Sequence, residues 1–177
     1  TVTLTLTERC NNSSRATATV TVVDKIAPTV MTQNITVELD ANGAGSITAD
    51  QINNGSFDNC GVASMALDIT SFTCDNLGAN TVTLTVTDGS NNSSSATATV
   101  KVVDKIAPTV ITKPFSIPLA NGVANITADD INDGSFDNCE FTLSIDRDTF
   151  TCGEIGDHFV TLTATDSSGN TSSSTAV

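Results

Sequence analysis

The side chains that could do chemistry in this sequence are carboxylates, and they recur in two sets about 80 positions apart. Carboxylate, amide and backbone carbonyl oxygens are the ligands that Ca²⁺ prefers. If the three acidic segments of a set meet in space, they predict a Ca²⁺ site. The candidate ligands are Asp24, Asp58, Asn59, Asp88 and Asn92 in the first set, and Asp104, Asp137, Asn138, Asp166 and Asn170 in the second.

A simpler interpretation of the same segments stays open. Asp, Asn, Gly and Ser are ordinary turn residues, and Asx side chains bind nearby backbone amides. Duplicated repeats share such loops without any ligand. No DxDxDG string of the EF-hand type is present.

Four of the five cysteines also recur as pairs. Cys60 and Cys74 are 14 positions apart, and Cys139 and Cys152 are 13 positions apart at equivalent places. We expect one disulfide within each unit, Cys60–Cys74 and Cys139–Cys152, formed in an oxidising compartment. A zinc site is the alternative, but it needs four closely spaced ligands, and the chain has only one histidine.

Cys10 is the odd cysteine. It stands where the other units have Ser90 and Ser168. It is either a free exposed thiol or a link to another chain.

Catalytic chemistry is not indicated. The sequence has no GxSxG, no HExxH and no glycine-rich phosphate loop. Paired aspartates could suggest a glycosidase, but here they repeat identically in turns. We therefore expect that the protein is not an enzyme.

The charge and hydropathy patterns exclude several other classes. The net charge is −13, and the seven Lys and Arg residues do not cluster. Such a chain would repel nucleic acid, so we expect no nucleic-acid partner. No run of about 18 apolar residues could span a membrane. No signal peptide is visible, so the chain is expected to be a segment of a longer secreted precursor.

The acidic residues and cysteines described above belong to an internal repeat of about 80 residues. The string Val22–Val30 recurs unchanged as Val102–Val110, and Ile47–Cys60 matches Ile126–Cys139 at 12 of 14 positions. The repeat predicts three parts. Residues 1–23 are the last two strands of a preceding repeat, 24–103 is a whole repeat, and 104–177 is a repeat with an incomplete last strand.

Within a repeat the hydrophobic pattern has a period of two. Val82, Leu84 and Val86 alternate with threonines, which is typical of strands with one solvated face. The sequence therefore predicts an all-β fold of tandem immunoglobulin-like antiparallel β-sandwiches. In the first whole repeat we expect strands near 33–39, 44–50, 63–69, 70–74, 80–87 and 95–103, with a helical turn within 49–59. In this fold the three acidic segments meet at one end of the sandwich, so a Ca²⁺ site would lie at the junction of consecutive repeats.

The linker between repeats is predicted to be stiff. It runs from one repeat into the next without Gly or Ser, and Pro28 and Pro108 restrict its backbone. Ile26 and Ile106 can pack into the joint. We expect an extended, rather rigid array of repeats.

The strings VDKIAPTV, FDNCG and TVTLTVTDGSNNSSSATATV, with the repeated cysteine pair, resemble HYR-type immunoglobulin-like repeats. Such repeats occur in hyalin-like extracellular proteins and in giant surface adhesins of Bacteroidetes. The most similar type is the SprB-like gliding adhesins, which are exported by the type IX system. This resemblance implies an extracellular or cell-surface location, attached at the outer membrane or in a filament. It also implies a stalk that projects an adhesive tip.

Three functions remain as alternatives. The first is a structural stalk or filament repeat of a secreted surface adhesin, with neighbouring repeats as partners and any surface or glycan ligand elsewhere in the chain. The second is an extracellular module that binds a ligand or carbohydrate, although no Trp or Tyr is present to stack on sugars. The third is a filament subunit assembled by strand exchange, in which Thr1–Val23 completes the sheet of a neighbour.

Overall fold

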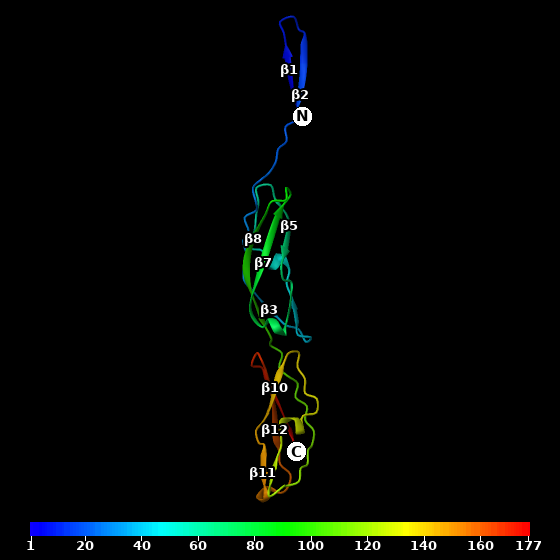
Figure 1. Cartoon of the computed structure of the whole chain (residues 1–177), viewed down its shortest axis with the longest axis vertical. Helices are drawn as coiled ribbons and strands as arrows, with labels where there is room; N and C mark the ends of the chain where they lie inside the picture. Colours follow the sequence, from blue (N-terminus) through cyan, green and yellow to red (C-terminus); the bar gives the residue numbers. More distant parts are fainter.

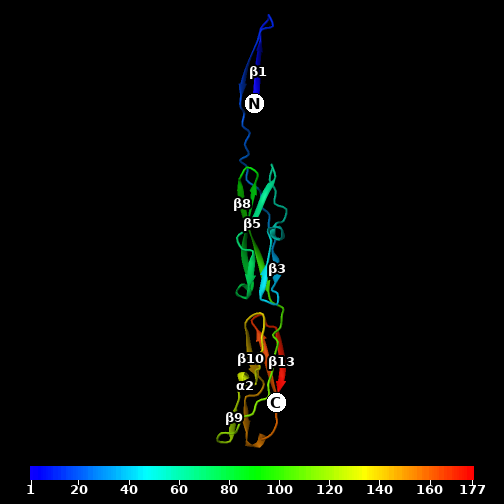
Figure 2. The ribbon, with the colours of Figure 1, turned by 90° about the vertical axis from the view of Figure 1, so that its right-hand side faces the viewer.

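The computed structural model describes all 177 residues. The chain forms an extended rod in which a hairpin and two β-sandwiches follow one another in single file (Figure 1). A view from the side gives the same single-file arrangement (Figure 2). The fold is all-β, in tandem sandwiches. The longest helices have four residues, so no helix has the length and apolarity needed to cross a membrane.

The hairpin at one end contains β1 (Val2–Thr7) and β2 (Ser13–Ala18), which pair antiparallel and bind no other strand. All of its residues are exposed, and Leu4 and Leu6 each expose 72% of their surface. The apolar face of this hairpin therefore has no opposing sheet.

The middle sandwich packs a four-stranded sheet against a two-stranded sheet. The large sheet has the order β3 (Ile35–Glu38), β8 (Ser93–Val103), β7 (Gly78–Asp88) and β5 (Val62–Leu67). The small sheet pairs β4 (Ala44–Ser46) with β6 (Ser71–Thr73). The pairs within the sheets are antiparallel except for β3, which joins the edge of β8 in parallel.

The core of the middle sandwich follows the predicted alternation. Val82, Leu84 and Val86 on β7 are all fully buried, while the threonines between them are half-buried. Phe72 of β6 and Ile52 of the short helix α1 (Ala49–Ile52) close the core from the opposite side. The predicted strand 44–50 is shorter than expected, because the chain turns into α1 after Thr48, whose amide is bound by the Gln51 side chain.

The last sandwich repeats this plan with a smaller core. Its three-stranded sheet has the order β10 (Phe141–Ile145), β12 (Val160–Asp166) and β13 (Thr171–Ala176). Its other sheet pairs β9 (Val123–Asn125) with β11 (Thr149–Thr151), and α2 (Ala128–Ile131) lies where α1 does. The segment that corresponds to β3 forms no strand here, since β13 ends at Ala176 and offers only the Val177 carbonyl, which accepts from the Phe115 amide.

Candidate functional site at the joint between repeats

Each predicted set of acidic segments does meet at one end of a sandwich. Asp24, Asp58 and Asp88 present carboxylate oxygens within 4.8 Å of one another. The second set does the same, and its members are Asp104, Asp137 and Asp166. In both sets one aspartate comes from the linker, one from the loop before β5 or β10, and one from the last position of β7 or β12.

The aspartate at the end of the long strand is fixed by its own turn. Asp88 is only 2% exposed, and its Oδ1 accepts from the amides of Ser90 (2.9 Å) and Asn92 (2.8 Å). Asp166 is 6% exposed and makes the same bonds with Ser168 and Asn170. These are Asx-type turn contacts, so the turn interpretation of the loops correctly describes this member of each set.

Asn92 and Asn170 connect that turn to the linker. The side-chain amide of Asn92 donates to Asp88 Oδ2 (2.7 Å) and to the Asp24 carbonyl (3.3 Å). Asn170 donates to Asp166 Oδ2 (2.7 Å) and to the Asp104 carbonyl (3.3 Å). Their nitrogen atoms face the cluster, so the interpretation of these two asparagines as oxygen ligands is replaced by a positioning role.

Several oxygens of the cluster are buried without a hydrogen-bond partner, and turn chemistry does not account for them. Asp104 is 5% exposed, and its Oδ1 accepts from the Ile106 amide (3.0 Å) while its Oδ2 has no partner. Buried polar atoms are nearly always paired, and each exception needs an explanation. The buried, unpartnered oxygens of the two sets are Asp24 Oδ2, Asp58 Oδ1, Asp104 Oδ2, Asp137 Oδ1 and Oδ2, and Asn138 Oδ1.

In the second set, the ionised form of Asp137 is disfavoured. Burial raises the pKa of Asp137, and the neighbouring Asp104 and Asp166 carboxylates act in the same direction. The backbone amides of Asn138 and Cys139 oppose this increase. In the first set, the backbone amide of Ile26 is the main cause of a lowered pKa of Asp24, followed by the Cys60 thiol. A divalent cation would offset the repulsion among three carboxylates and would satisfy the unpartnered oxygens.

The asparagine that follows the central aspartate contacts the cysteine beside it. Asn138 donates to Asp104 Oδ1 (3.2 Å) and, across the joint, to the Asp40 carbonyl of the middle repeat (3.3 Å). Its Oδ1 remains without a partner and faces no other donor, so it is the amide oxygen available to a cation. Asn59 donates to Cys60 Sγ (3.2 Å) at the equivalent place.

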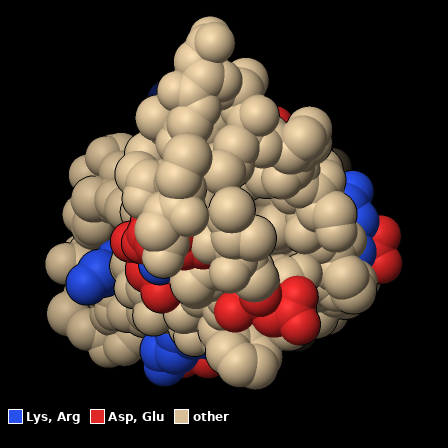
Figure 3. All heavy atoms as spheres, turned by 90° about the horizontal axis from the view of Figure 1, so that it is seen from below, with Lys and Arg blue, Asp and Glu red and all other residues tan.

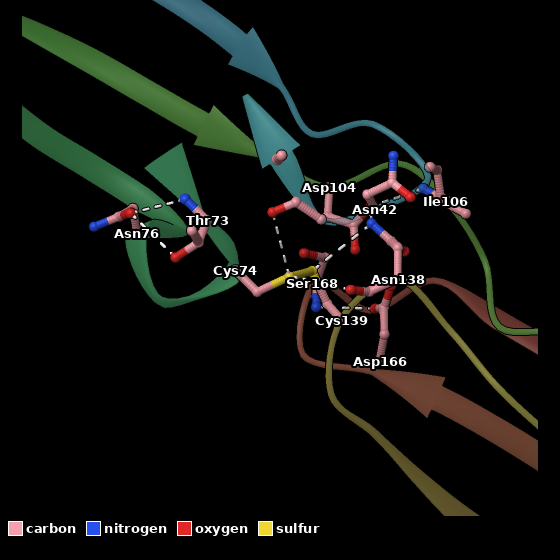
Figure 4. The surroundings of a disulfide bond; sticks show 12 residues. Asn42, Thr73, Cys74, Asn76, Asp104, Ile106, Asn138, Cys139, Asp166 and Ser168 are labelled. Carbon is pink, nitrogen blue, oxygen red and sulfur yellow. Dashed lines mark hydrogen bonds between the residues drawn. A yellow bond between two sulfur atoms is a disulfide. The ribbon is translucent and has the colours of Figure 1, made fainter. Parts of the chain in front are cut away.

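The joint also contains a disulfide that the sequence analysis did not predict. Cys74 of the middle repeat is bonded to Cys139 of the last repeat, with 5.7 Å between their Cα atoms. Figure 4 shows this bond beside Asp104, Asn138 and Asp166, so the cross-link and the acidic cluster lie in one joint. The expected pairs Cys60–Cys74 and Cys139–Cys152 are therefore wrong, and Cys60 and Cys152 are free and exposed.

The physical reason for this correction is the direction of the chain between the two cysteines. β5 follows Cys60 and leads away from the acidic end, and β6 then places Cys74 next to the turn at Gly43. An extended strand advances about 3.3 Å per residue, so the strand alone takes the chain well beyond the roughly 7 Å that a disulfide can span between Cα atoms. The two cysteines of one repeat thus lie at opposite ends of it.

Cys10 lies in the turn of the β1–β2 hairpin and is free and exposed. The turn around it is closed by backbone bonds between Glu8 and Asn12, and Glu8 takes the place of the aspartate found in the other two turns.

The remaining contacts of the joint are few. Lys105 forms an ion pair with Glu38 across the joint, but both side chains are exposed, so the pair contributes little to stability. Ile106 is half-buried and Pro108 is buried, whereas Ile26 is 62% exposed beside the isolated hairpin. The linker isoleucine therefore packs only where two complete sandwiches meet.

No family model matches this sequence, and no curated protein matches it. Among solved structures, the chain is similar to extracellular cadherin domains 1–4 of protocadherin gamma B7, with 14% identity, coverage of 85% of this chain and 49% of that chain, and a TM-score of 0.32. The human desmocollin-1 ectodomain is 10% identical, the match covers 88% of this chain and 37% of that chain, and the TM-score is 0.35. The EC1–4 segment of PcdhgB3 is 12% identical, the match covers 99% of this chain and 56% of that chain, and the TM-score is 0.35.

The chain spans less than two thirds of each of these structures. The similarity concerns the tandem arrangement of β-sandwiches and carries no information on ligands or partners.

Proposed function

We propose that this chain is a stalk segment of a secreted cell-surface adhesin of the HYR type, whose repeats hold an adhesive tip away from the cell. Its role is mechanical rather than catalytic. An SprB-like gliding adhesin is the specific form of this proposal, and it rests on the linker and cysteine motifs.

The observation that carries the proposal is the construction of the joint. A short linker without glycine, a disulfide between the repeats and an interlocked acidic cluster all lie in the same few residues. Each of these devices removes freedom of bending or twisting between the sandwiches. A protein that only tethered two binding domains would need none of them, because flexible linkers are rich in Gly and Ser.

We further propose that Ca²⁺ occupies the joint. Asp104, Asp137 and Asp166 would provide carboxylate oxygens, and Asn138 Oδ1 would add an amide oxygen. The unpartnered, buried state of Asp104 Oδ2 and of both Asp137 oxygens supports this assignment. The Asp24, Asp58 and Asp88 set would hold a second ion more weakly, since Asp24 is only half-buried there.

A cavity in the last repeat does not favour the ligand-binding alternative. It has a volume of about 570 Å³ and lies in the last repeat, where Phe115, Ile117 and Val177 line it. In the middle repeat the equivalent space is filled by Val100 and Val102 of β8, which pair with Ile35 and Val37. The cavity thus lies where the middle repeat has the paired strands β3 and β8, so its apolar lining belongs to the interior of the sandwich.

Small-angle X-ray scattering of the oxidised chain tests the proposal. With Ca²⁺ we expect the maximum dimension of a straight rod, and with a chelator a broader distance distribution from bending at the joint. The Asp129→Asn variant, which removes an exposed carboxylate of α2, is the matched control and should keep the Ca²⁺ response. A folded-back particle in Ca²⁺ would contradict the stalk, and identical profiles with and without chelator would remove the ion.

A further inference from the structure

The two free cysteines of the sandwiches occupy the same surroundings as the two bonded ones. Cys74 and Cys152 both follow the short strand of the small sheet and begin a 3₁₀ turn. The Cys74 Sγ lies 3.9 Å from the Gly43 carbonyl, and the Cys152 Sγ lies 3.6 Å from the Gly122 carbonyl. Both glycines have positive φ, and a Cβ on either one would crowd the neighbouring sulfur.

The opposite ends of the two sandwiches correspond in the same way. Cys60 and Cys139 each follow an Asp-Asn pair, and each sulfur accepts from that asparagine, at 3.2 Å from Asn59 and 3.7 Å from Asn138. Cys139 is only 9% exposed because the middle repeat covers it, whereas Cys60 is exposed where no complete repeat is docked.

From this correspondence we infer that Cys152 and Cys60 are the open halves of two further joints, each bonded to a cysteine of another repeat of this type. Cys152 takes a cysteine in the position of Cys139, and Cys60 takes one in the position of Cys74. Each sandwich is then bonded to both of its neighbours, and no disulfide lies within a sandwich. The inference rests on the proposed stalk, because it requires further repeats at both ends.

The chemistry of each bond is an ordinary thiol–disulfide exchange. Two cysteine thiols lose two protons and two electrons and form one S–S bond. A low-molecular-weight disulfide such as oxidised glutathione accepts them and leaves as two thiols.

The partner that fits the Cys152 end is defined by that surface. Seen from this end, the molecule presents mainly uncharged atoms (Figure 3). Ile155, which follows the 3₁₀ turn of Cys152, is 81% exposed, and Ile117 is 41% exposed. Ile117 or Pro118 takes the place of Glu38, and Glu154 of the 3₁₀ turn is already paired with Arg147, so the Lys105–Glu38 ion pair has no direct equivalent here. A repeat with an Asp-Asn-Cys loop and an apolar linker residue would cover this surface.

Bonding at every joint has a mechanical consequence. Tension along the stalk would pass from sulfur to sulfur, and within each repeat only the 14 positions from Cys60 to Cys74, or the 13 from Cys139 to Cys152, would carry it. At most about 3.5 Å of length per residue is available, so such a segment cannot stretch beyond about 50 Å. The long strands β7 and β8 would be shielded from the load, and the stalk would be nearly inextensible.

A lengthened chain tests the inference directly. Residues 1–177 are followed by a second copy of residues 100–177, which continues the register because Val177 corresponds to Thr99. The protein is oxidised with glutathione, its thiols are blocked, and its disulfides are mapped by mass spectrometry. We expect Cys152 linked to the Cys139 of the added copy, next to the original Cys74–Cys139 bond as internal reference. The Cys152→Ser variant should leave the added Cys139 as a thiol.

A second lengthened chain covers the case in which that added repeat does not fold. Its addition is residues 100–103 followed by residues 24–103, which places a copy of Cys60 opposite Cys152. Linkage of Cys152 to the added cysteine in either chain supports the inference. If Cys152 is a thiol in both chains, or is bonded to the Cys139 of its own repeat, the inference is overturned. Small-angle X-ray scattering of the same samples separates the two proposals: the profile of a straight rod would support the stalk even if Cys152 does not form the bond.

Discussion

Asp137 is the aspartate of the two sets whose side-chain oxygens are both buried without a hydrogen bond. Burial raises its pKa against the opposing effect of the nearby Asn138 and Cys139 backbone amides, and neither of its oxygens accepts a hydrogen bond of normal geometry. A carboxyl with a raised folded-state pKa destabilises the protein when it is ionised, and this cost disappears as pH falls below the unfolded value. At neutral pH without Ca²⁺, Asp137 is therefore expected to weaken the last repeat.

The Asp137→Asn variant should accordingly be more stable than the parent in chelator, by roughly 1 kcal/mol, or about 4 °C in Tm. The same variant should lose the stabilisation that Ca²⁺ gives the parent, which is about 2.7 kcal/mol at a hundredfold excess over Kd. Thermal melts in chelator and in Ca²⁺ measure both effects, with Asp129→Asn as control. A lower Tm for Asp137→Asn than for the parent in chelator would contradict this, because it would mean that the Asp137 carboxylate has a stabilising partner in the folded protein.

The joint between the repeats also requires a residue without a side chain at position 43. The φ of Gly43 is +71°, and a Cβ there would lie 2.7 Å from both the Asn138 carbonyl oxygen and the Cys74 Sγ. Gly55 has a similar φ of +80° but open space around it, so it is a matched control. Alanine at either position costs roughly 1 kcal/mol of backbone strain.

Only Gly43→Ala should also hinder formation of the Cys74–Cys139 bond. In a glutathione redox buffer we expect at least a severalfold lower fraction of linked protein than in the parent, while Gly55→Ala stays linked. Mass spectrometry after thiol blocking gives the fraction. If the fraction of disulfide-linked protein is the same in the two variants, the Cys74–Cys139 bond does not require the close packing of Gly43 against the last repeat.

At the scale of the elements, each sandwich has an aspartate directly after β5 or β10 that binds the long strand β7 or β12. Asp68 Oδ1 accepts from the Thr83 amide (2.7 Å), and Asp146 Oδ1 accepts from the Thr161 amide (2.8 Å). These bonds lower the pKa of both carboxyls. A lowered folded-state pKa gives stability that is present above the unfolded value and is lost as pH falls through the folded one.

The parent should therefore be more stable than Asp68→Asn at neutral pH, by less than about 1 kcal/mol, because the site is exposed. The difference should stay constant down to about pH 5 and shrink below about pH 4, where the parent carboxyl becomes protonated. Paired thermal melts between pH 7 and 2.5 follow it. A difference that grows on acidification would reverse the assigned role of the carboxylate.

The elements also show how far the sequence predicts this protein. The alternation of Val82, Leu84 and Val86 correctly predicts a strand with one buried face, since a period of two has no other simple explanation. The meeting of the acidic segments follows from sandwich topology, because the loops before β5 and after β7 share an end with the linker. The unpartnered state of Asp24 Oδ2 and Asp104 Oδ2 could not be predicted, since it depends on how the atoms of the three loops pack around each carboxylate and not on residue type.

The disulfide connectivity shows where reasoning from spacing fails. A short separation such as that of Cys60 and Cys74 suggests a small closed loop when the chain between them can turn back. Here β5 and β6 fill most of that interval and place Cys74 at the opposite end of the sandwich from Cys60, so the separation reflects the length of the sandwich instead. The predicted strands at 63–69 and 70–74 do not reveal this, because two consecutive strands can also turn back on each other.

At the scale of the whole molecule, the sandwiches lie in single file, and we expect the joints to resist bending and the cross-links to limit extension. The Cys74–Cys139 bond closes a loop of 65 positions that includes β7, β8 and the linker. Because tension passes through the sulfur bridge, this loop cannot contribute length when the ends of the chain are pulled. Reduction should restore that length without changing the sequence of the chain.

Single-molecule force spectroscopy, with the chain held at Thr1 and Val177, tests this most directly. Full unfolding of the reduced protein should release about 230 Å more contour length than that of the oxidised protein, from 65 positions at about 3.5 Å each. The Cys139→Ser variant should behave like the reduced protein under both conditions. Equal contour lengths for the oxidised and reduced parent, or a difference of only about 50 Å from a bridge within one repeat, would contradict a joint bonded between repeats.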